Sequence, residues 1–149
     1  MKKTAVFPGT FSPFTKGHEY IVKKSTLLFE KVIIAIGINS KKNNLYPLEE
    51  RKKWVENLYK RNQQIEVISY EKLTIDICKE YSSKYIIRGI RDAQDFIYEK
   101  RIADFNRELD DTIETIFLLT PPNLSHISST LVRDIKKRGG DIKHLIPKK

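Results

Sequence analysis

Residues 4–18 read TAVFPGTFSPFTKGH, an apolar run that leads through a loop into a helical pattern. The run 4–7 is short, apolar and closed by Pro8-Gly9, which predicts a buried strand. From about Gly17 onward, apolar residues recur three and four positions apart, which predicts a helix. This order of strand, loop and helix is the unit that the rest of the chain repeats.

Four more units follow along the 149 residues. Further strands are predicted at 31–38, 65–68, 85–87 and 115–119, further helices at about 47–58, 74–82, 93–109 and 128–138, and a short last helix after Asp141. Buried strands that alternate with helices specify a parallel sheet covered on both faces. A chain of this length corresponds to about one domain. We therefore expect one α/β domain over residues 1–149, Rossmann-like, with a five-stranded parallel sheet and helices on both faces.

The composition favours some classes of ligand and excludes several classes of protein. The chain has 28 basic and 19 acidic residues, a formal net charge of +9. This charge favours an anionic partner such as a phosphorylated metabolite, a nucleic acid or a membrane surface. The single cysteine, Cys78, excludes a disulfide scaffold, and three scattered histidines exclude a zinc-finger-like site. The longest apolar run, 32–36, is far too short to cross a bilayer. We expect a cytoplasmic protein with no membrane partner.

Ligands of parallel sheets bind outside the carboxyl ends of the strands. In the segment after the first strand, Gly17 at a helix start lets a phosphate approach free backbone N–H groups. His18 stands at the same positive helix end and can donate a hydrogen bond to a phosphoryl oxygen. After the second strand, Lys41 and Lys42 can reach toward a phosphate. The segments that this rule selects are 8–17, 39–46, 69–74, 88–92 and 120–129.

Two later segments add further anion-binding groups. Arg88 and Arg91 straddle Gly89 directly after a buried strand, and guanidinium groups match the geometry of phosphate. The alternative for these arginines is an ion pair with Asp92 or Asp95; Glu99 shares that helix face. Hydroxyl residues 128–130 begin a helix and form a second anion site, or else an ordinary N-cap. One polyphosphate would explain all three features together.

No Ser-His-Asp arrangement, paired carboxylates or cysteine nucleophile stands out in the sequence. The remaining groups are threonine, histidine, lysine, arginine and backbone amides. Such groups position substrates and stabilise charge, as phosphoryl or nucleotidyl transfer requires.

The motifs also resemble those of a known family. The sequence Thr15-Lys16-Gly17-His18 is similar to the T/H-x-G-H signature of the nucleotidylyltransferase superfamily, and Ile127-Ser128-Ser129-Thr130 to its second signature. Over the whole chain, the sequence resembles bacterial-type phosphopantetheine adenylyltransferases. The matching motifs are PGTF at 8–11, LEER at 48–51, IRGIR at 87–91, DF at 95–96, YE at 98–99 and NR at 106–107.

The resemblance implies a reversible transfer of an adenylyl group from ATP to 4′-phosphopantetheine. Pyrophosphate leaves and dephospho-coenzyme A forms, without a covalent enzyme intermediate. Mg²⁺ accompanies ATP and is held mainly by its phosphates, with no protein ligand. The family further implies a homohexamer, coenzyme A as a product-like or feedback ligand, and no nucleic-acid partner.

The resemblance also implies roles for individual residues. His18 would stabilise the transition state, assisted by Thr10 and Lys42. Residues implied to bind ATP are Thr10, Phe11, His18, Gly89, Ile90, Arg91, Glu99, Leu124, Ser125, His126, Ile127, Ser128, Ser129 and Thr130. Residues implied to bind phosphopantetheine are Thr10, Lys42, Leu73, Thr74 and Arg88. The chain departs from the family pattern at Ser12, commonly an aspartate, and at Lys72, commonly acidic or small.

Three alternatives remain open at this point. A nicotinate or nicotinamide mononucleotide adenylyltransferase would keep the reaction and change the acceptor. A basic nucleic-acid-binding module would account for the charge, although its basic residues should then form one stripe. An inactive scaffold would keep only the fold. A cytidylyltransferase is disfavoured because R-T-x-G-[IV]-S is absent before Ser129.

Overall fold

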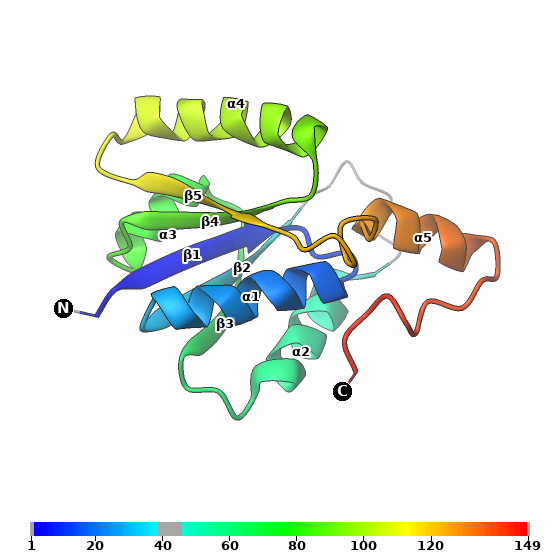
Figure 1. Ribbon diagram of the computed structural model, residues 1–149. Helices are drawn as coiled ribbons and strands as arrows, with labels where there is room; N and C mark the ends of the chain where they lie inside the picture. The colour runs from blue at the N-terminus through cyan, green and yellow to red at the C-terminus, as the bar shows by residue number, and fades with distance from the viewer. Residues whose placement is uncertain (1, 39–45, 149) are drawn as a thin grey trace.

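A parallel sheet organises the part of the chain that the computed structural model describes, residues 2–38 and 46–148 (Figure 1). Its strands are β1 (Thr4–Gly9), β2 (Lys31–Gly37), β3 (Ile65–Tyr70), β4 (Tyr85–Ile90) and β5 (Glu114–Leu119). The helices are α1 (Lys16–Leu28), α2 (Leu48–Tyr59), α3 (Thr74–Glu80), α4 (Ala93–Leu109) and α5 (Ser129–Lys137). The strand order is β3-β2-β1-β4-β5, and every pairing is parallel. The predicted five-stranded parallel sheet is confirmed.

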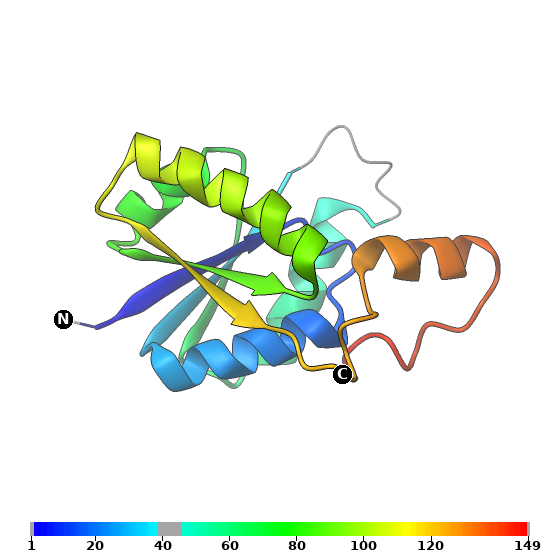
Figure 2. The same ribbon diagram turned by 45° about the horizontal axis from the view of Figure 1, so that its top comes forward.

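Helices cover both faces of this sheet. Helices α1 and α2 pack on one face, α3 and α4 pack on the other, and α5 lies beyond the carboxyl edge (Figures 1 and 2). The central strands β1 and β2 are buried from both sides: Phe7 and Ile34 pack into the core beneath α1, and Val6 and Ile33 into the core beneath α3. This two-sided burial explains why these strands are nearly continuous apolar runs rather than alternating patterns.

The sheet opens at its centre. Pairing of β1 with β2 runs the full length of β1, from Thr4 to Gly9, whereas its pairing with β4 covers only Ala5 and Val6. The connections after β1 and β4 lead to α1 and α4, which lie on opposite faces. The two strands therefore part at their carboxyl ends, at the switch point in strand order where α/β proteins bind ligands.

The strand ends correct the sequence prediction in one place that affects the site. We placed Arg88 and Gly89 in a loop, but β4 continues through Ile90. The reason is the edge strand β5, whose Phe117, Leu118 and Leu119 pair with these three residues. Arg88 therefore projects from a hydrogen-bonded strand, which fixes its direction more firmly than a loop would.

The predicted last helix after Asp141 is wrong. Residues 143–145 form a turn, and the Asp141 carboxylate accepts a hydrogen bond from the Lys143 N–H, as in an Asx turn. This segment instead carries Leu145 into a small apolar cluster with Ile127 and Val132. Tertiary packing of one leucine has prevailed over local helix formation.

Gly9 is a position where a side chain would not fit. An added Cβ would lie 2.8 Å from the Phe11 ring, which is itself only 3% exposed. That ring packs against Phe7, Phe14 and His18 at centroid distances of 5.2, 5.3 and 4.9 Å. Phe11 also adopts a positive φ of 49°. The ring cannot retreat without moving its neighbours, His18 included.

We expect Gly9→Ala to lower the free energy of unfolding by about 1–3 kcal/mol, the range for overpacking. Thermal or urea unfolding measures this. Gly37→Ala is the matched control, because its Cβ would meet nothing closer than 3.6 Å. Equal stability of the two variants would contradict the packing argument.

Candidate active site

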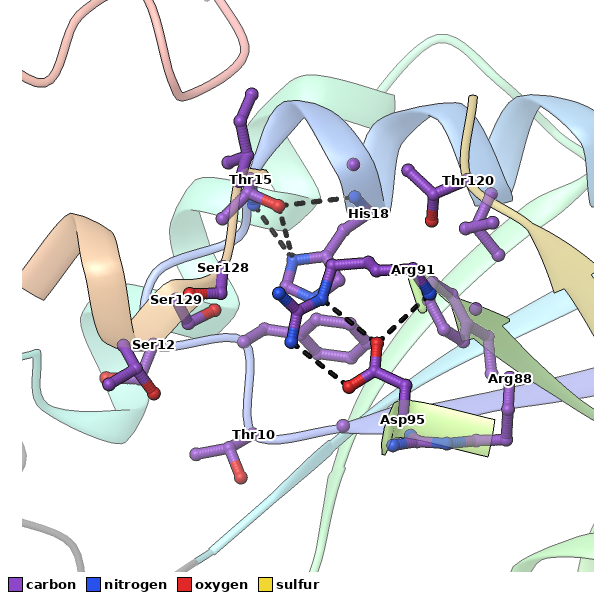
Figure 3. Close-up of a pocket in the computed structure, with 18 of the residues that line it drawn as sticks. Thr10, Ser12, Thr15, His18, Arg88, Arg91, Asp95, Thr120, Ser128 and Ser129 are labelled. Carbon is purple, nitrogen blue, oxygen red and sulfur yellow. Dashed lines mark hydrogen bonds and ion pairs between the residues drawn. The ribbon is translucent and has the colours of Figure 1, made fainter. Parts of the chain in front are cut away.

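A cavity lies where β1 and β4 part, and side chains from five segments converge on it (Figure 3). The segments are the end of β1 with its loop, the start of α1, the β4–α4 connection, the end of β5 and the start of α5. Sequence-predicted residues that line it are Thr10, Phe11, His18, Arg88, Gly89, Arg91, Glu99, Ile127, Ser128, Ser129 and Thr130. Segments up to 120 residues apart in sequence thus meet at the predicted edge.

A capping box at the start of α1 fixes the His18 imidazole. Thr15 is the N-cap residue: its Oγ1 accepts from the His18 N–H at 3.3 Å, and its own N–H donates to His18 Nδ1 at 2.9 Å. Capping boxes commonly use glutamate at this third helical position, and here histidine takes the role. Because Nδ1 accepts, the proton of the neutral ring is assigned to Nε2. The ring therefore offers an N–H donor.

The surroundings of His18 keep its ring neutral. Burial, and secondarily the charges of Arg88 and Arg91, lower the pKa of His18 from 6.5 to about 3. The rings of Phe11 and Phe14 lie 4.9 and 5.4 Å from the imidazole, centroid to centroid. At neutral pH His18 is thus an uncharged hydrogen-bond donor held in one orientation.

The first turn of α1 leaves a backbone donor for an anion. The Lys16 N–H donates to the Leu145 carbonyl at 3.0 Å. The Gly17 N–H has no acceptor among residues 2–38 and 46–148. A Cβ at Gly17 would meet only Thr15 Oγ1 at 3.4 Å and the Ile127 carbonyl at 4.0 Å, so the space above this glycine belongs to the cavity. An anion can approach the helix backbone closely there.

The start of α5 is a second anion-binding helix end. Ser128 caps it by accepting from the Leu131 N–H, and the Ser129 hydroxyl donates to the Pro13 carbonyl at 2.8 Å. Within the described part of the chain, the N–H groups of Ser129 and Thr130 have no acceptor. Two helix N-termini, from α1 and α5, therefore point free N–H groups at one cavity.

Arg88 bridges the gap between the parted strands. Its Nε and Nη2 donate to the two carboxylate oxygens of Glu99 at 2.8 and 2.6 Å, and its Nη1 donates to the Pro8 carbonyl of β1. Burial disfavours the cation, but the hydrogen bonds and charge of Glu99 outweigh this and raise the pKa of Arg88. Three of its five N–H groups are used. One on each terminal nitrogen remains for a phosphate.

Two further arginines line the cavity, one paired with a carboxylate and one held by neutral acceptors. Arg91 forms an ion pair with Asp95 at 3.1 Å, and the Asp95 carboxylate also accepts from the Arg91 backbone N–H. Arg133 of α5 donates to the Ser12 carbonyl at 2.6 Å and to Thr130 Oγ1 at 3.2 Å. No carboxylate of the described residues pairs with Arg133. The cavity therefore keeps an excess of positive charge, which suits a polyphosphate.

Other sequence-predicted residues lie outside this cavity. Leu73 and Thr74 sit at the end of β3 and the start of α3, with Thr74 Oγ1 3.3 Å from the Tyr70 hydroxyl. His126 is exposed, and Ser125 donates to the Pro122 carbonyl. Neither Ile90 nor Leu124 lines the cavity. Lys42 lies outside the described residues.

Glu99 differs most from its expected role. We expected it to hold the nucleotide, but both its oxygens accept from Arg88 and the residue is only 7% exposed. Glu99 lines the cavity, but its carboxylate is already engaged by Arg88. The spacing of Arg88 and Glu99 on successive elements did not reveal this pairing.

Sequence reasoning gave no site role to five polar residues that line the cavity: Ser12, Thr15, Asp95, Thr120 and Arg133. A capping motif could have pointed to Thr15, and Thr120 lies in the segment 120–129 that the strand-end rule selected, although it was not singled out there. Arg133 lies one helical turn beyond Ser129 and Thr130, so helical spacing could have placed it on the same face.

Comparison with known proteins identifies the family. A cytidylyltransferase-like family model matches residues 6–135. A phosphopantetheine adenylyltransferase of Flavobacterium psychrophilum is 48% identical over 97% of this chain and 95% of its own. The chain belongs to the phosphopantetheine adenylyltransferase family. The resemblance drawn from the motifs is thereby confirmed.

The similarity extends over the full length. The family member of Cytophaga hutchinsonii is 44% identical over 100% of this chain and 99% of its own. Among solved structures, a bifunctional NMN adenylyltransferase/ADP ribose pyrophosphatase of Francisella tularensis superposes with a TM-score of 0.74. It is 19% identical and covers 98% of this chain but 45% of its own, so that likeness concerns the fold alone.

The low pKa of His18 makes a testable statement about protonation. We expect the imidazole to stay neutral, with its proton on Nε2, throughout pH 5–8, which two-dimensional ¹⁵N NMR of labelled protein measures. Between pH 3 and 6.5 the unfolded chain binds a proton at residue 18 that the folded chain excludes, so His18 destabilises the fold as pH falls through this range. His18→Gln assigns the signal and should remove that contribution. A titration midpoint near 6.5 would contradict the burial argument.

The family resemblance assigns Arg88 to the acceptor phosphate, and Glu99 holds the Arg88 guanidinium. We therefore expect a change at Glu99 to impair binding of the acceptor in particular. Glu99→Gln should raise the KM for phosphopantetheine by about tenfold, the scale for a hydrogen bond to a charged group, and change the KM for ATP much less. Steady-state kinetics with each substrate varied measures both. Glu108→Gln, an exposed change on the same helix, is the control. An effect on ATP alone would return Glu99 to the nucleotide role predicted from the sequence.

Proposed function

We propose that this chain catalyses the reversible transfer of an adenylyl group from ATP to 4′-phosphopantetheine, forming dephospho-coenzyme A and pyrophosphate. The observation that carries the proposal is the sequence identity of 44–48%, over nearly the full length, to proteins named phosphopantetheine adenylyltransferase. The cavity supports it, because two open helix N-termini and two oriented arginines there suit two phosphate-bearing substrates.

The chemistry is a direct displacement at phosphorus. An oxygen of the acceptor phosphate forms a bond to the α-phosphorus of ATP, the bond from that phosphorus to the bridging oxygen breaks, and pyrophosphate leaves with the electron pair. His18 Nε2–H donates to an α-phosphate oxygen as charge develops there. Because the ring is neutral and Nδ1 is occupied, His18 acts as a donor and not as a base.

The remaining groups position the reactants. Arg88 offers its two free N–H groups to the acceptor phosphate, and the N–H groups of Gly17, Ser129 and Thr130 hold the ATP phosphates. We propose that Thr10 and Lys42 assist His18 at the reacting centre, as the family resemblance implies. In-line attack needs these groups rather than an enzyme nucleophile, so no covalent intermediate forms.

A divalent cation fits the site only as a companion of ATP. Among the described residues, no group of three or more His, Cys, Asp and Glu side chains is clustered to hold a metal. The carboxylates of the cavity, Asp95 and Glu99, are already engaged by Arg91 and Arg88. We propose that the ATP phosphates bind Mg²⁺, which would supply positive charge to balance that of the pyrophosphate group.

Helix α4 supports the proposal of a homohexamer. Its outer face carries an apolar stripe at helical spacing: Tyr98, Ile102, Phe105 and Leu109 are 63, 38, 66 and 55% exposed. Glu99 is the only buried residue of this helix. A continuous exposed apolar stripe marks a protein interface. We propose that copies of this chain cover it in one another.

Two further proposals concern ligands and location. Coenzyme A shares the phosphopantetheine arm with the acceptor, so we propose that it binds the same cavity as a feedback ligand. We propose that nucleic acid is not a partner of this chain. No helix of the described residues is long and apolar enough to span a membrane. We propose a cytoplasmic location, where ATP is available.

The acceptor assay tests the activity. Pyrophosphate release from MgATP should require 4′-phosphopantetheine and should not occur with nicotinate or nicotinamide mononucleotide. Release with a mononucleotide would keep the mechanism and overturn the acceptor. Release with none of the three would overturn the proposed activity.

His18→Ala should lower turnover by at least about a hundredfold, the scale for loss of one transition-state donor. ATP binding, measured by calorimetry, should change by less than about threefold, because His18 acts on charge that develops only in the transition state. Turnover near that of the unchanged protein would remove His18 from the mechanism.

Phe105→Glu should dissociate the assembly, since it places a charge in the apolar stripe of α4. Light scattering after gel filtration should give six chain masses for the unchanged protein and fewer for the variant. Lys23→Glu, on the exposed side of α1, is the control. A monomeric unchanged protein would contradict the hexamer.

A further inference from the structure

Arg51 is a buried arginine that none of the roles above uses. It lies in the first turn of α2 and is only 2% exposed. Its Nε donates to the Tyr46 carbonyl at 3.0 Å, and its Nη1 donates to the carbonyls of Thr10 at 2.6 Å and Gly37 at 3.2 Å. These carbonyls belong to the loop after β1, the end of β2 and the residue pair that precedes α2. One side chain therefore ties together three segments at the carboxyl edge of the sheet.

The charge of Arg51 has no carboxylate partner. Arg51 takes part in no ion pair among the described residues. Residues 39–45 contain no aspartate or glutamate. Burial lowers the pKa of Arg51. A cation in the first turn of a helix also opposes the helix dipole. The position is thus unfavourable for α2 itself, and the carbonyl groups only partly compensate the buried charge.

The contact with Thr10 has a consequence for the cavity. The peptide that joins Thr10 to Phe11 is trans, so its carbonyl and its N–H point in opposite directions. Since Arg51 holds the Thr10 carbonyl, the Phe11 N–H points away from Arg51. That N–H has no acceptor within residues 2–38 and 46–148, and Thr10 and Phe11 both line the cavity.

We propose that Arg51 is a positioning residue of the active site. It orients the Thr10–Phe11 peptide so that the Phe11 N–H meets a substrate phosphate, and it adds an uncompensated positive charge beneath that phosphate. Arg51 itself does not touch the substrate, since it is absent from the cavity lining. This inference rests on the proposed phosphate-binding function of the cavity.

Two substitutions separate the charge of Arg51 from its hydrogen bonds to the three carbonyls. Arg51→Met keeps the length of the side chain and removes its charge and donors. Arg51→Lys keeps the charge but loses the fork that reaches three carbonyls. Val55→Ala is the matched control: Val55 is fully buried one turn further along α2 and belongs to the apolar core. The measurements are the Kd for pyrophosphate by calorimetry, kcat and KM for each substrate, and the unfolding temperature.

We expect Arg51→Met to weaken pyrophosphate binding by about tenfold or more, as for loss of oriented charged hydrogen bonds. Arg51→Lys should recover part of that loss. Val55→Ala should lower the unfolding temperature and leave pyrophosphate binding within about twofold, since packing loss alone does not reorient the loop. The KM for ATP should rise more than that for the acceptor.

Two results would overturn the inference: pyrophosphate binding by Arg51→Met within about twofold of the unchanged protein, or equal weakening by Val55→Ala. If Arg51→Met does not fold, Arg51→Lys decides, with unchanged pyrophosphate binding overturning the proposal. Pyrophosphate binding does not depend on the acceptor. A failure of the acceptor assay would therefore overturn the proposed activity without deciding the role of Arg51.

Discussion

The parting of β1 and β4 is the constraint on which the rest of the site depends. The helices that follow these two parallel strands lie on opposite faces of the sheet, and the pairing of β1 with β4 stops after Val6. Arg88 spans the opening by donating to the Pro8 carbonyl, while Glu99 of α4 holds it from the other side. The crevice is therefore built from the topology, and one guanidinium both bridges it and equips it for phosphate.

The arginines in and beside the crevice fall into two groups according to the acceptors that hold them. Arg88 and Arg91 are directed by carboxylates of α4, whereas Arg51 and Arg133 are held by backbone carbonyls. The paired cations have fixed orientations, and the carbonyl-bound cations retain their full charge. Helix N-termini add donors that cost no side-chain entropy. Such a preorganised field can stabilise the charge of a pentacoordinate phosphorus without reorganisation.

The sequence predicted the architecture because the central strands β1 and β2 are buried on both faces and read as apolar runs, and helical patterns alternate with all five strands. It predicted the cavity edge because parallel strands end together, and Gly17, His18 and Ser128–Thr130 meet there as expected. It did not predict that Arg88 belongs to a strand, since that depends on pairing with a distant edge strand. Pairing between Arg88 and Glu99 was equally hidden, and so was the role of Arg51, whose partners are carbonyls up to 41 residues away. Local helix signals after Asp141 misled because Leu145 is drawn into a cluster with Ile127.

The neutral His18 has a consequence for how the reaction responds to its surroundings. A donor whose pKa lies near 3 does not change its protonation between mildly acidic and mildly basic conditions. The acceptor phosphate is a monoester, and its second ionisation lies near pH 6. Acidification would then act through the nucleophile, which loses charge, and not through His18. The fall in rate on the acid side would then follow the ionisation of the substrate, because protonation removes the reactive dianion.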